Sequence, residues 1–202
     1  KEHCDDGQRH LYVKDLTIAH VRLWGWRFVD EFCWLRPGVP GRWPDRFKNG
    51  FEPVAHYARG AAKFRPESVS YASDAIPVKS SSIGAVTSCT NGAYWNLSAD
   101  SESGMAFPSN VVECAGVERG TGHTAAFPVG LPEFFIKAFS DAGDVIVDPF
   151  LGSGSTLIAS AKNARVCRGI EISPRYCDVI RRRWTRFALA AGIDPGPGAL
   201  DP

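Results

Sequence analysis

A short apolar strand, a turn with two glycines, a helix and a second apolar strand follow one another late in the chain. This succession constrains the fold more than any other feature. Residues 144–148 are rich in β-branched side chains, as expected for a short buried parallel strand. Gly152 and Gly154 allow the backbone to turn tightly and to approach a ligand. Residues 156–162 are predicted to be helical and residues 166–172 to form the next strand, so the pattern predicts a βαβ unit of an α/β protein.

An acidic residue, Glu171, lies near the end of the second predicted strand. In a mononucleotide-binding half-fold, an acid about 20 residues beyond the glycine turn binds the ribose hydroxyls. Leu157 stands where a dinucleotide fingerprint needs its third glycine, and no lysine follows Gly154 as in a phosphate-binding loop. The pattern therefore favours a cofactor with adenosine but no pyrophosphate, and S-adenosylmethionine is the leading candidate. A plain βαβ unit with a surface glutamate is the alternative, and an NAD-linked oxidoreductase is a more distant one.

Three motifs carry a resemblance to a known family. They are His123-Thr-Ala-Ala-Phe-Pro-Val-Gly-Leu-Pro132, Asp148-Pro-Phe-Leu-Gly-Ser-Gly-Ser-Thr156 and Gly169-Ile-Glu-Ile-Ser-Pro-Arg-Tyr176. In this order they resemble motifs X, I and II of the S-adenosylmethionine-dependent DNA amino-methyltransferases, which methylate the exocyclic amine of adenine (N6) or cytosine (N4). The resemblance implies an α/β fold, with a Rossmann-like S-adenosylmethionine-dependent methyltransferase sheet that has helices on both faces.

The same resemblance implies which residues contact the cofactor. Phe127 and Pro128 would flank its methionine end, and Glu171 would bind the ribose hydroxyls. The contacts expected from the loop are Asp148, Pro149, Phe150, Gly152, Ser153, Gly154 and Thr156.

The amino-terminal half extends the resemblance. A short strand is predicted at residues 11–13, an amphipathic helix at 16–24, and strands at 28–35 and 51–57. Their order resembles the β class of the family, in which the catalytic motifs precede the target-recognition segment and the cofactor motifs come last. We therefore expect the second half of the catalytic region at residues 1–60, a small irregular target-recognition insert at 61–115, the cofactor-binding region at 116–190 and a loose tail at 191–202. Within the insert, short β-like pieces such as residues 68–71 are expected to alternate with turns.

The catalytic tetrapeptide of the family, Asp/Asn/Ser-Pro-Pro followed by an aromatic residue, has no counterpart here, because the chain contains no Pro-Pro pair. Catalytic residues are therefore not assigned. In the β-class order the tetrapeptide would precede Leu11, and the chain begins with Lys1 and has Met105 as its single methionine, so we expect it to be incomplete at its N-terminus. In the resembled fold the tetrapeptide strand lies between the strands near Val147 and Tyr12. We expect a companion chain or a missing N-terminal segment to supply it, or the sheet to close in another way.

A group of cations in the first third of the chain is the candidate for contact with double-stranded DNA. A base methylase must extrude its target nucleotide, which requires phosphate contacts and stacking surfaces. The candidates, interleaved with Trp34, Trp43 and Phe47, are Arg36, Arg42, Arg46, Lys48, Arg59, Lys63 and Arg65. A solvated charged face is the alternative. Residues 181–183, three consecutive arginines, are expected on the outer face of a helix that follows Pro174.

Composition permits these expectations without specifying them. A chain of 202 residues with 44% hydrophobic residues can bury one sizeable core. A net charge of +1 excludes a globally basic nucleic-acid binder. There is no long apolar run, no signal pattern and no C-x-x-C pair among the six cysteines, which predicts a soluble cytoplasmic protein with reduced thiols and no metal centre.

We therefore expect a site-specific DNA methyltransferase, with adenine slightly favoured over cytosine-N4 as the target. This chain is expected to carry the cofactor-binding half of the enzyme and to be inactive alone. A non-catalytic cofactor- or DNA-binding module derived from a methylase is one alternative. An RNA or small-molecule methyltransferase that shares the loop is another. Host restriction, phage protection and cell-cycle marking are equally compatible roles.

Overall fold

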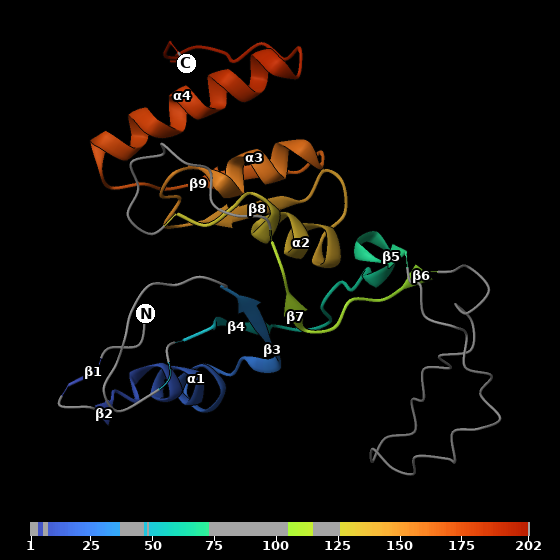
Figure 1. Ribbon diagram of the computed structural model, residues 1–202, viewed down its shortest axis with the longest axis vertical. Coiled ribbons are helices and arrows are strands. Elements are labelled where there is room, and N and C mark those ends of the chain that lie inside the picture. The colour runs from blue at the N-terminus through green and yellow to red at the C-terminus, as the bar shows by residue number, and fades with distance from the viewer. Residues whose placement is uncertain are drawn as a thin grey trace.

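The computed structural model describes residues 4–5, 8–36, 47, 49–72, 105–114 and 126–201 (Figure 1). In chain order the described elements are β1 (Cys4–Asp5), β2 (Gln8–Arg9), α1 (Tyr12–Arg22), β3 (Arg27–Leu35), β4 (Phe51–Ala58), the 3-10 helix η1 (Pro66–Val69), β5 (Tyr71–Ala72), β6 (Met105–Ala106), β7 (Val111–Val112), α2 (Gly130–Phe139), β8 (Val145–Asp148), α3 (Ser155–Lys162), β9 (Val166–Gly169) and α4 (Pro174–Ala190). None of these helices combines the length and apolar character that crossing a bilayer requires.

Strand β3 is the centre of a sheet ordered β4, β3, β7. It pairs antiparallel with β4 from Arg27 opposite Ala58 to Leu35 opposite Phe51, with one irregularity near its start, and parallel with β7. The predicted strands at 28–35 and 51–57 are therefore confirmed. Side chains alternate in direction along a strand, so Phe32 and Trp34 share one face of β3, and both are buried there.

Helix α2 joins this sheet to the second one. Phe32 and Trp34 of β3 are buried together with Leu131 of α2. The rings of Phe32 and Phe135 meet edge to face at 5.1 Å between centroids. On the opposite side Glu133 of α2 forms an ion pair of 2.7 Å with Lys162 of α3. In Figure 1, α2 accordingly lies between β7 and the β8–α3–β9 unit.

The βαβ unit predicted from the glycine turn is present. Strands β8 and β9 are parallel, with Val145 opposite Val166 and Asp148 opposite Gly169. Strand β9 ends at Gly169, so Glu171 lies in the segment beyond the strand rather than within it. The backbone remains tied there, because the Ile170 amide donates to the Asp148 carbonyl at 2.9 Å.

Two predictions of local structure were wrong. Residues 11–13 are not a strand, because α1 begins at Tyr12 and the Asp15 amide donates to the Leu11 carbonyl at 2.9 Å. The β-like piece expected around residues 68–71 is mostly the helix η1, and only Tyr71 enters a strand. Both segments are too short for an apolar pattern to distinguish period 2 from period 3.6.

The expected insert lies in large part on residues outside the described ranges. Its two described ends meet, since β5 pairs antiparallel with β6, Tyr71 opposite Ala106 and Ala72 opposite Met105. The chain therefore leaves the body and returns to it at one place. The tail after α4 contains no helix or strand in its described part, and it is tied back by a 3.0 Å hydrogen bond from Trp184 Nε1 to the Pro195 carbonyl.

In the described part of the chain, the β4–β3–β7 sheet and the β8–β9 sheet do not join into one continuous sheet. Strand β8 pairs with β9 along one edge, and no described strand pairs with its other edge. Val145 and Val147 of β8 are 58% and 66% exposed. The described structure thus leaves apolar strand surface uncovered beside the glycine loop.

Candidate functional site

A small cavity lies at the carboxyl ends of β8 and β9, where open α/β sheets bind ligands. Its volume is about 290 Å³. The described residues that line it are Ala126, Phe127, Phe150, Leu151, Gly152, Ser153, Glu171 and Tyr176. It brings together the three motifs that the sequence singled out.

The loop between β8 and α3 is built by its two glycines and one acid. Gly152 and Gly154 have φ angles of +57° and +85°, a region that favours glycine. Asp148 accepts hydrogen bonds from the Phe150 amide at 2.9 Å and from the Thr156 hydroxyl at 2.7 Å. Asp148 and Thr156 therefore shape the loop from within.

Glu171 closes the cavity from the β9 side. One carboxylate oxygen accepts from the Gly152 amide and the other from the Ser173 amide, each at 2.8 Å. These bonds hold the carboxylate against the loop. Each oxygen keeps a lone pair that can accept a bond from a ligand hydroxyl.

Ser155 attaches the Phe127 segment to the loop. Its hydroxyl donates to the Phe127 carbonyl at 2.9 Å, and the serine is 2% exposed. The ring of Phe150, by contrast, is 85% exposed although it borders the cavity. The site therefore has one fixed aromatic wall and one aromatic ring that is free to contact a ligand.

Half of the predicted cofactor contacts line the cavity, namely Phe127, Phe150, Gly152, Ser153 and Glu171. The others, which do not appear among its described lining residues, are Pro128, Asp148, Pro149, Gly154 and Thr156. Their direct contact with a cofactor stays a prediction.

Sequence reasoning missed Tyr176 and Leu151 as wall residues. The signal for Tyr176 was available, because it lies in the first turn of α4, shortly after Glu171. Leu151 is 8% exposed, and its backbone amide donates a hydrogen bond to the Ile170 carbonyl at 2.9 Å, which holds it in the wall. No local sequence pattern predicts this contact.

The expectation that residues 181–183 all face outward was wrong for one residue. Arg181 and Arg182 are exposed, but Arg183 is 9% exposed and its guanidinium contacts Ser153 and Ser155. Helical spacing explains the difference, because residue 183 falls on the same face of α4 as the apolar Ile180.

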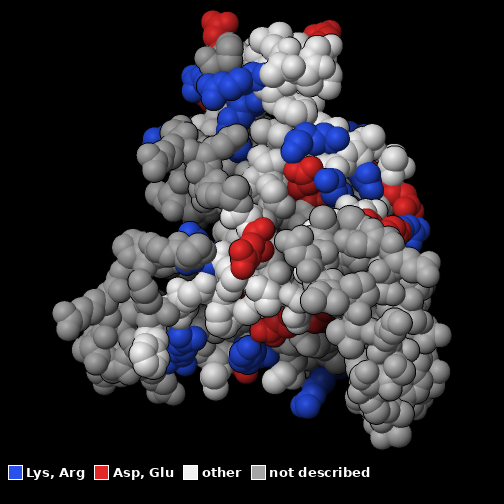
Figure 2. Space-filling view, turned by 45° about the vertical axis from the view of Figure 1, so that its right-hand side comes forward, with Lys and Arg blue, Asp and Glu red and all other residues white. Residues whose placement is uncertain are grey.

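The candidate DNA contacts do not form one patch where they are described; Arg42, Arg46 and Lys48 lie outside the described residues. Arg36 lies at the end of β3, forms an ion pair with Glu52 and stacks over Trp34 at 4.9 Å. Arg59 lies beyond the other end of the β3–β4 hairpin, over Trp26 at 4.4 Å. Figure 2 shows basic and acidic residues interspersed on the face that it presents.

Lys63 and Arg65 lie away from the cavity, at the amino end of β8. Lys63 forms ion pairs with Asp144 at 2.6 Å and Asp141 at 3.0 Å, and Arg65 contacts Asp141 at 3.1 Å. Hydrogen bonds that Lys63 donates to Asp144 and Asp141 raise the pKa of Lys63. Because these cations already have carboxylate partners at the far end of the strand, a DNA role for them is not supported by their geometry.

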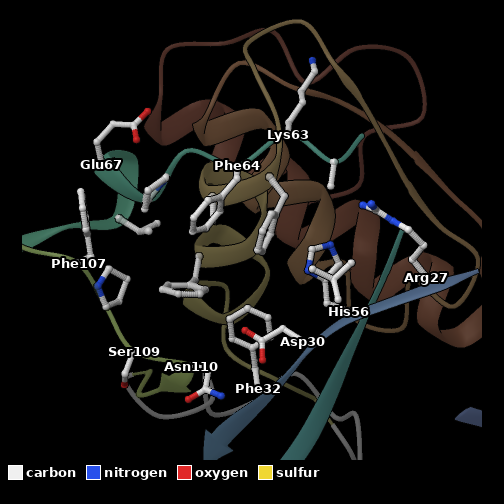
Figure 3. Close-up of a pocket in the computed structure, with 18 residues that line it drawn as sticks. Arg27, Asp30, Phe32, His56, Lys63, Phe64, Glu67, Phe107, Ser109 and Asn110 are labelled. Atoms are coloured by element: carbon white, nitrogen blue, oxygen red, sulfur yellow. The ribbon is translucent and has the colours of Figure 1, made fainter. Parts of the chain in front are cut away.

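A larger cavity of about 810 Å³ lies between the described ends of the insert, β3 and α2 (Figure 3). Its lining includes five phenylalanines, among them Phe32, Phe64 and Phe139, while the ammonium end of Lys63 points away from it. Burial lowers the pKa of His56 in its wall, and Asp30 opposes the shift. The described lining of this larger cavity includes neither the glycine loop nor Glu171. We therefore assign the smaller cavity of about 290 Å³ as the candidate site.

Comparison with curated proteins finds relatives that match limited stretches of the chain. The orphan methyltransferase M.BamHII of Bacillus amyloliquefaciens is 42% identical over 67 residues, which are 33% of this chain and 25% of the relative. The type II methyltransferase M.ScaI of Streptomyces caespitosus is 49% identical over 63 residues, 31% of this chain and 20% of the relative. The chain thus spans a quarter or less of the length of these relatives.

Solved structures resemble the whole described architecture. The PvuII DNA methyltransferase, described as cytosine-N4-specific, matches with a TM-score of 0.64 and 19% identity over 90% of this chain and 60% of that chain. The structure of a complex of M1.HpyAVI with S-adenosylmethionine matches with a TM-score of 0.56 and 16% identity. The match covers 86% of this chain and 70% of that chain. These likenesses confirm the Rossmann-like α/β methyltransferase fold.

A protein-family match covers most of the chain. The family described as DNA methylase matches residues 6–182, which include the β3–β4 hairpin, the glycine loop and Glu171. Because this match extends over most of the 202 residues, the chain belongs to the DNA methylase family, as the resemblance to the DNA amino-methyltransferases predicted.

Proposed function

We propose that this chain binds S-adenosylmethionine in the cavity between Phe127, the glycine loop and Glu171. We further propose that it provides the cofactor half of an enzyme that methylates an exocyclic amine in DNA. The observation that carries the proposal is the meeting of these three motifs around one cavity at the carboxyl ends of β8 and β9. The curated relatives support the methyltransferase class, although this chain matches only part of their length. The solved complex of M1.HpyAVI with S-adenosylmethionine supports the cofactor.

The residues present fit the cofactor. Glu171 presents a fixed carboxylate that can accept bonds from both ribose hydroxyls, and Phe127, Phe150 and Tyr176 supply aromatic walls. The cavity volume of about 290 Å³ is near the lower end of the roughly 300–1,000 Å³ of ligand sites, which suits an adenosine moiety. When bound, the cofactor supplies a methyl group on a sulfonium centre.

The contribution of this chain to methyl transfer is positioning. Glu171 and the amides of the loop fix one end of the ligand, and the Phe127 segment limits its freedom at the other end. Transfer to an amine depends on holding donor and acceptor in line. The base must leave the duplex to reach the site, which costs a few kcal/mol.

Double-stranded DNA is the proposed substrate, with adenine slightly preferred over cytosine-N4. Arg36 and Arg59 are the described cations that remain candidates for phosphate contact, together with Arg42, Arg46 and Lys48. Each of the two described arginines lies over a tryptophan, which holds the guanidinium at the surface. We also propose that the motifs of the protein follow the β-class order and that the protein is cytoplasmic.

We propose that a companion chain, or a further segment of the same polypeptide, supplies a strand beside β8. The uncovered edge of β8 and the exposed side chains of Val145 and Val147 support it. That strand would carry the groups that orient the target amine. This chain by itself is then expected to bind the cofactor and to lack methyl transfer.

Isothermal titration of the chain with S-adenosylmethionine tests the cofactor site. We expect weak binding by the native chain and, for Glu171→Ala, an affinity lower by about tenfold or more, because a hydrogen-bonded carboxylate is lost. Glu67→Ala is the matched control, since Glu67 is exposed and lines the other cavity. Absence of binding by the native chain, or equal affinities of the two variants, would overturn the site.

A radiolabelled methyl-transfer assay on mixed-sequence duplex DNA tests the activity. We expect no transfer by the chain alone, and transfer once the strand proposed beside β8 is supplied by a companion chain or a further segment. Robust transfer by the isolated chain would refute the need for a companion. Binding without turnover even in the completed protein would instead identify a non-catalytic cofactor-binding module, and transfer to structured RNA in competition would identify an RNA methyltransferase.

A further inference from the structure

Arg183 occupies a position unlike that of its two neighbours on α4. It is 9% exposed, whereas Arg181 and Arg182 are exposed. Its Nη1 donates to the backbone carbonyl of Ser153 and, at 3.0 Å, to the hydroxyl of the same residue. The Ser155 hydroxyl lies 3.4 Å from the same nitrogen.

The acceptors of Arg183 belong to the glycine loop itself. Ser153 is 4% exposed and stands between Gly152 and Gly154, both of which have positive φ. Ser155 begins α3 and donates to the carbonyl of Phe127. One guanidinium therefore connects α4 with the loop directly and, through Ser155, with the aromatic wall of the cavity.

The loop is held from two sides by groups of opposite charge. On the cavity side, the Glu171 carboxylate accepts a hydrogen bond from the Gly152 amide at 2.8 Å. On the α4 side, Arg183 donates to the Ser153 carbonyl, and Arg183 is not among the described residues that line the cavity. Hydrogen bonds to the Gly152 amide and to the Ser153 carbonyl orient the two peptide units that contain these groups, because each peptide is planar.

We propose that Arg183 is a positioning residue that keeps the glycine loop in the conformation competent to bind the cofactor. The inference rests on the proposed function of the cavity. A planar guanidinium with several donors suits the role better than a lysine, whose ammonium is a compact point charge. Without Arg183, the carbonyl and hydroxyl of Ser153 lose their donor in a place nearly closed to water, so the loop samples other conformations.

The test compares Arg183→Met and Arg183→Lys with the matched control Arg182→Met, which changes the exposed neighbour on the same helix. Amide hydrogen exchange without cofactor is measured first. We expect faster exchange in peptides that span residues 150–157 for Arg183→Met, a smaller increase for Arg183→Lys, and unchanged exchange in β3 and β4.

Titration with S-adenosylmethionine is measured second. A loop that is competent for only a tenth of the time lowers the apparent affinity about tenfold. We expect that loss for Arg183→Met, partial recovery for Arg183→Lys and native affinity for Arg182→Met. If Arg183→Met does not fold, Arg183→Lys and Ser153→Ala, which removes the 3.0 Å contact, carry the same comparison.

Two results would overturn the inference. One is an Arg183→Met chain that matches Arg182→Met in both measurements. The other is exchange that accelerates equally in every element, which would make Arg183 a general stabiliser of the fold. Failure of the native chain to bind the cofactor would reject the proposed function alone, because the exchange experiment needs no ligand.

Discussion

Gly169 shows at the level of one residue how the cavity depends on an absent side chain. A Cβ atom at this position would lie 2.5 Å from Leu151 Cδ2 and 3.0 Å from its Cδ1. Leu151 is 8% exposed and forms part of the cavity wall. The bare backbone of Gly169 therefore lets the loop cross the end of β9 and deliver Leu151 to the cavity.

Gly169→Ala is expected to destabilise the chain by about 1–3 kcal/mol, the usual cost of overpacking a filled interior. The displaced Leu151 should also weaken cofactor binding. Thermal melting and titration with S-adenosylmethionine measure the two effects. Gly50→Ala is the control, because its added Cβ would meet nothing within 4 Å. Equal melting temperatures for the two variants would contradict the packing argument.

Residue roles were predictable from the sequence where they depend on local chain geometry. The glycines of the loop and Glu171 were found because their spacing is a property of one βαβ unit. Arg183 was missed because a run of arginines reads as a solvated face, although residues 176, 180, 183 and 187 share one helical stripe. The contact of Leu151 with Gly169 depends on two segments meeting, which no local pattern encodes.

Among the elements, the hairpin of β3 and β4 and the helices α3 and α4 were predictable because each has a sustained period or a clear boundary. Pro174, for example, begins α4 at the position where proline is favoured in a helix. The three residues 11–13 have no such period, and the helix that continues from them decided their structure. Element type therefore followed from length and period, whereas the ends of short elements did not.

The segment between β4 and β5 is attached to the amino end of β8 by charge. A hydrogen bond from Lys63 lowers the pKa of Asp141, and bonds from the Asp141 amide and from Lys63 lower the pKa of Asp144. An acid whose pKa is lower in the folded state stabilises the fold above its ordinary value of 3.8. That contribution is lost as the pH falls through 3.8 toward the folded value.

Lys63→Met is therefore expected to lower the melting temperature at pH 7 and to reduce the decrease in melting temperature as the pH falls below about 4. Both effects should shrink in high salt, because the paired side chains are partly exposed to solvent. Lys14→Met on α1 is the control, because Lys14 forms no ion pair with a carboxylate among the described residues. An acid transition that is identical in Lys63→Met and the native chain would show that this attachment does not contribute.

For the whole molecule, the order of strands depends on pairing between distant segments. In the described chain, α2 packs between the β4–β3–β7 sheet and the β8–α3–β9 unit, and β8 keeps one edge without a described strand partner. The sequence predicted a missing neighbour for β8 only through the family resemblance, since periodicity identifies strands and not their partners. Exposed Val145 and Val147 are the physical counterpart of that expectation.

An uncovered strand edge with apolar side chains promotes pairing with other chains, and a charge on the edge opposes it. We therefore expect the chain alone to associate as its concentration rises, and Val147→Lys to reduce the association while changing stability by no more than about 0.5 kcal/mol. Val21→Lys on α1 is the matched control, because Val21 is also an exposed valine but lies on a helix. Sedimentation velocity over a range of concentrations measures the difference. If both lysine variants associate like the native chain, the edge of β8 is already covered, and the strand that we propose beside it has no place to bind.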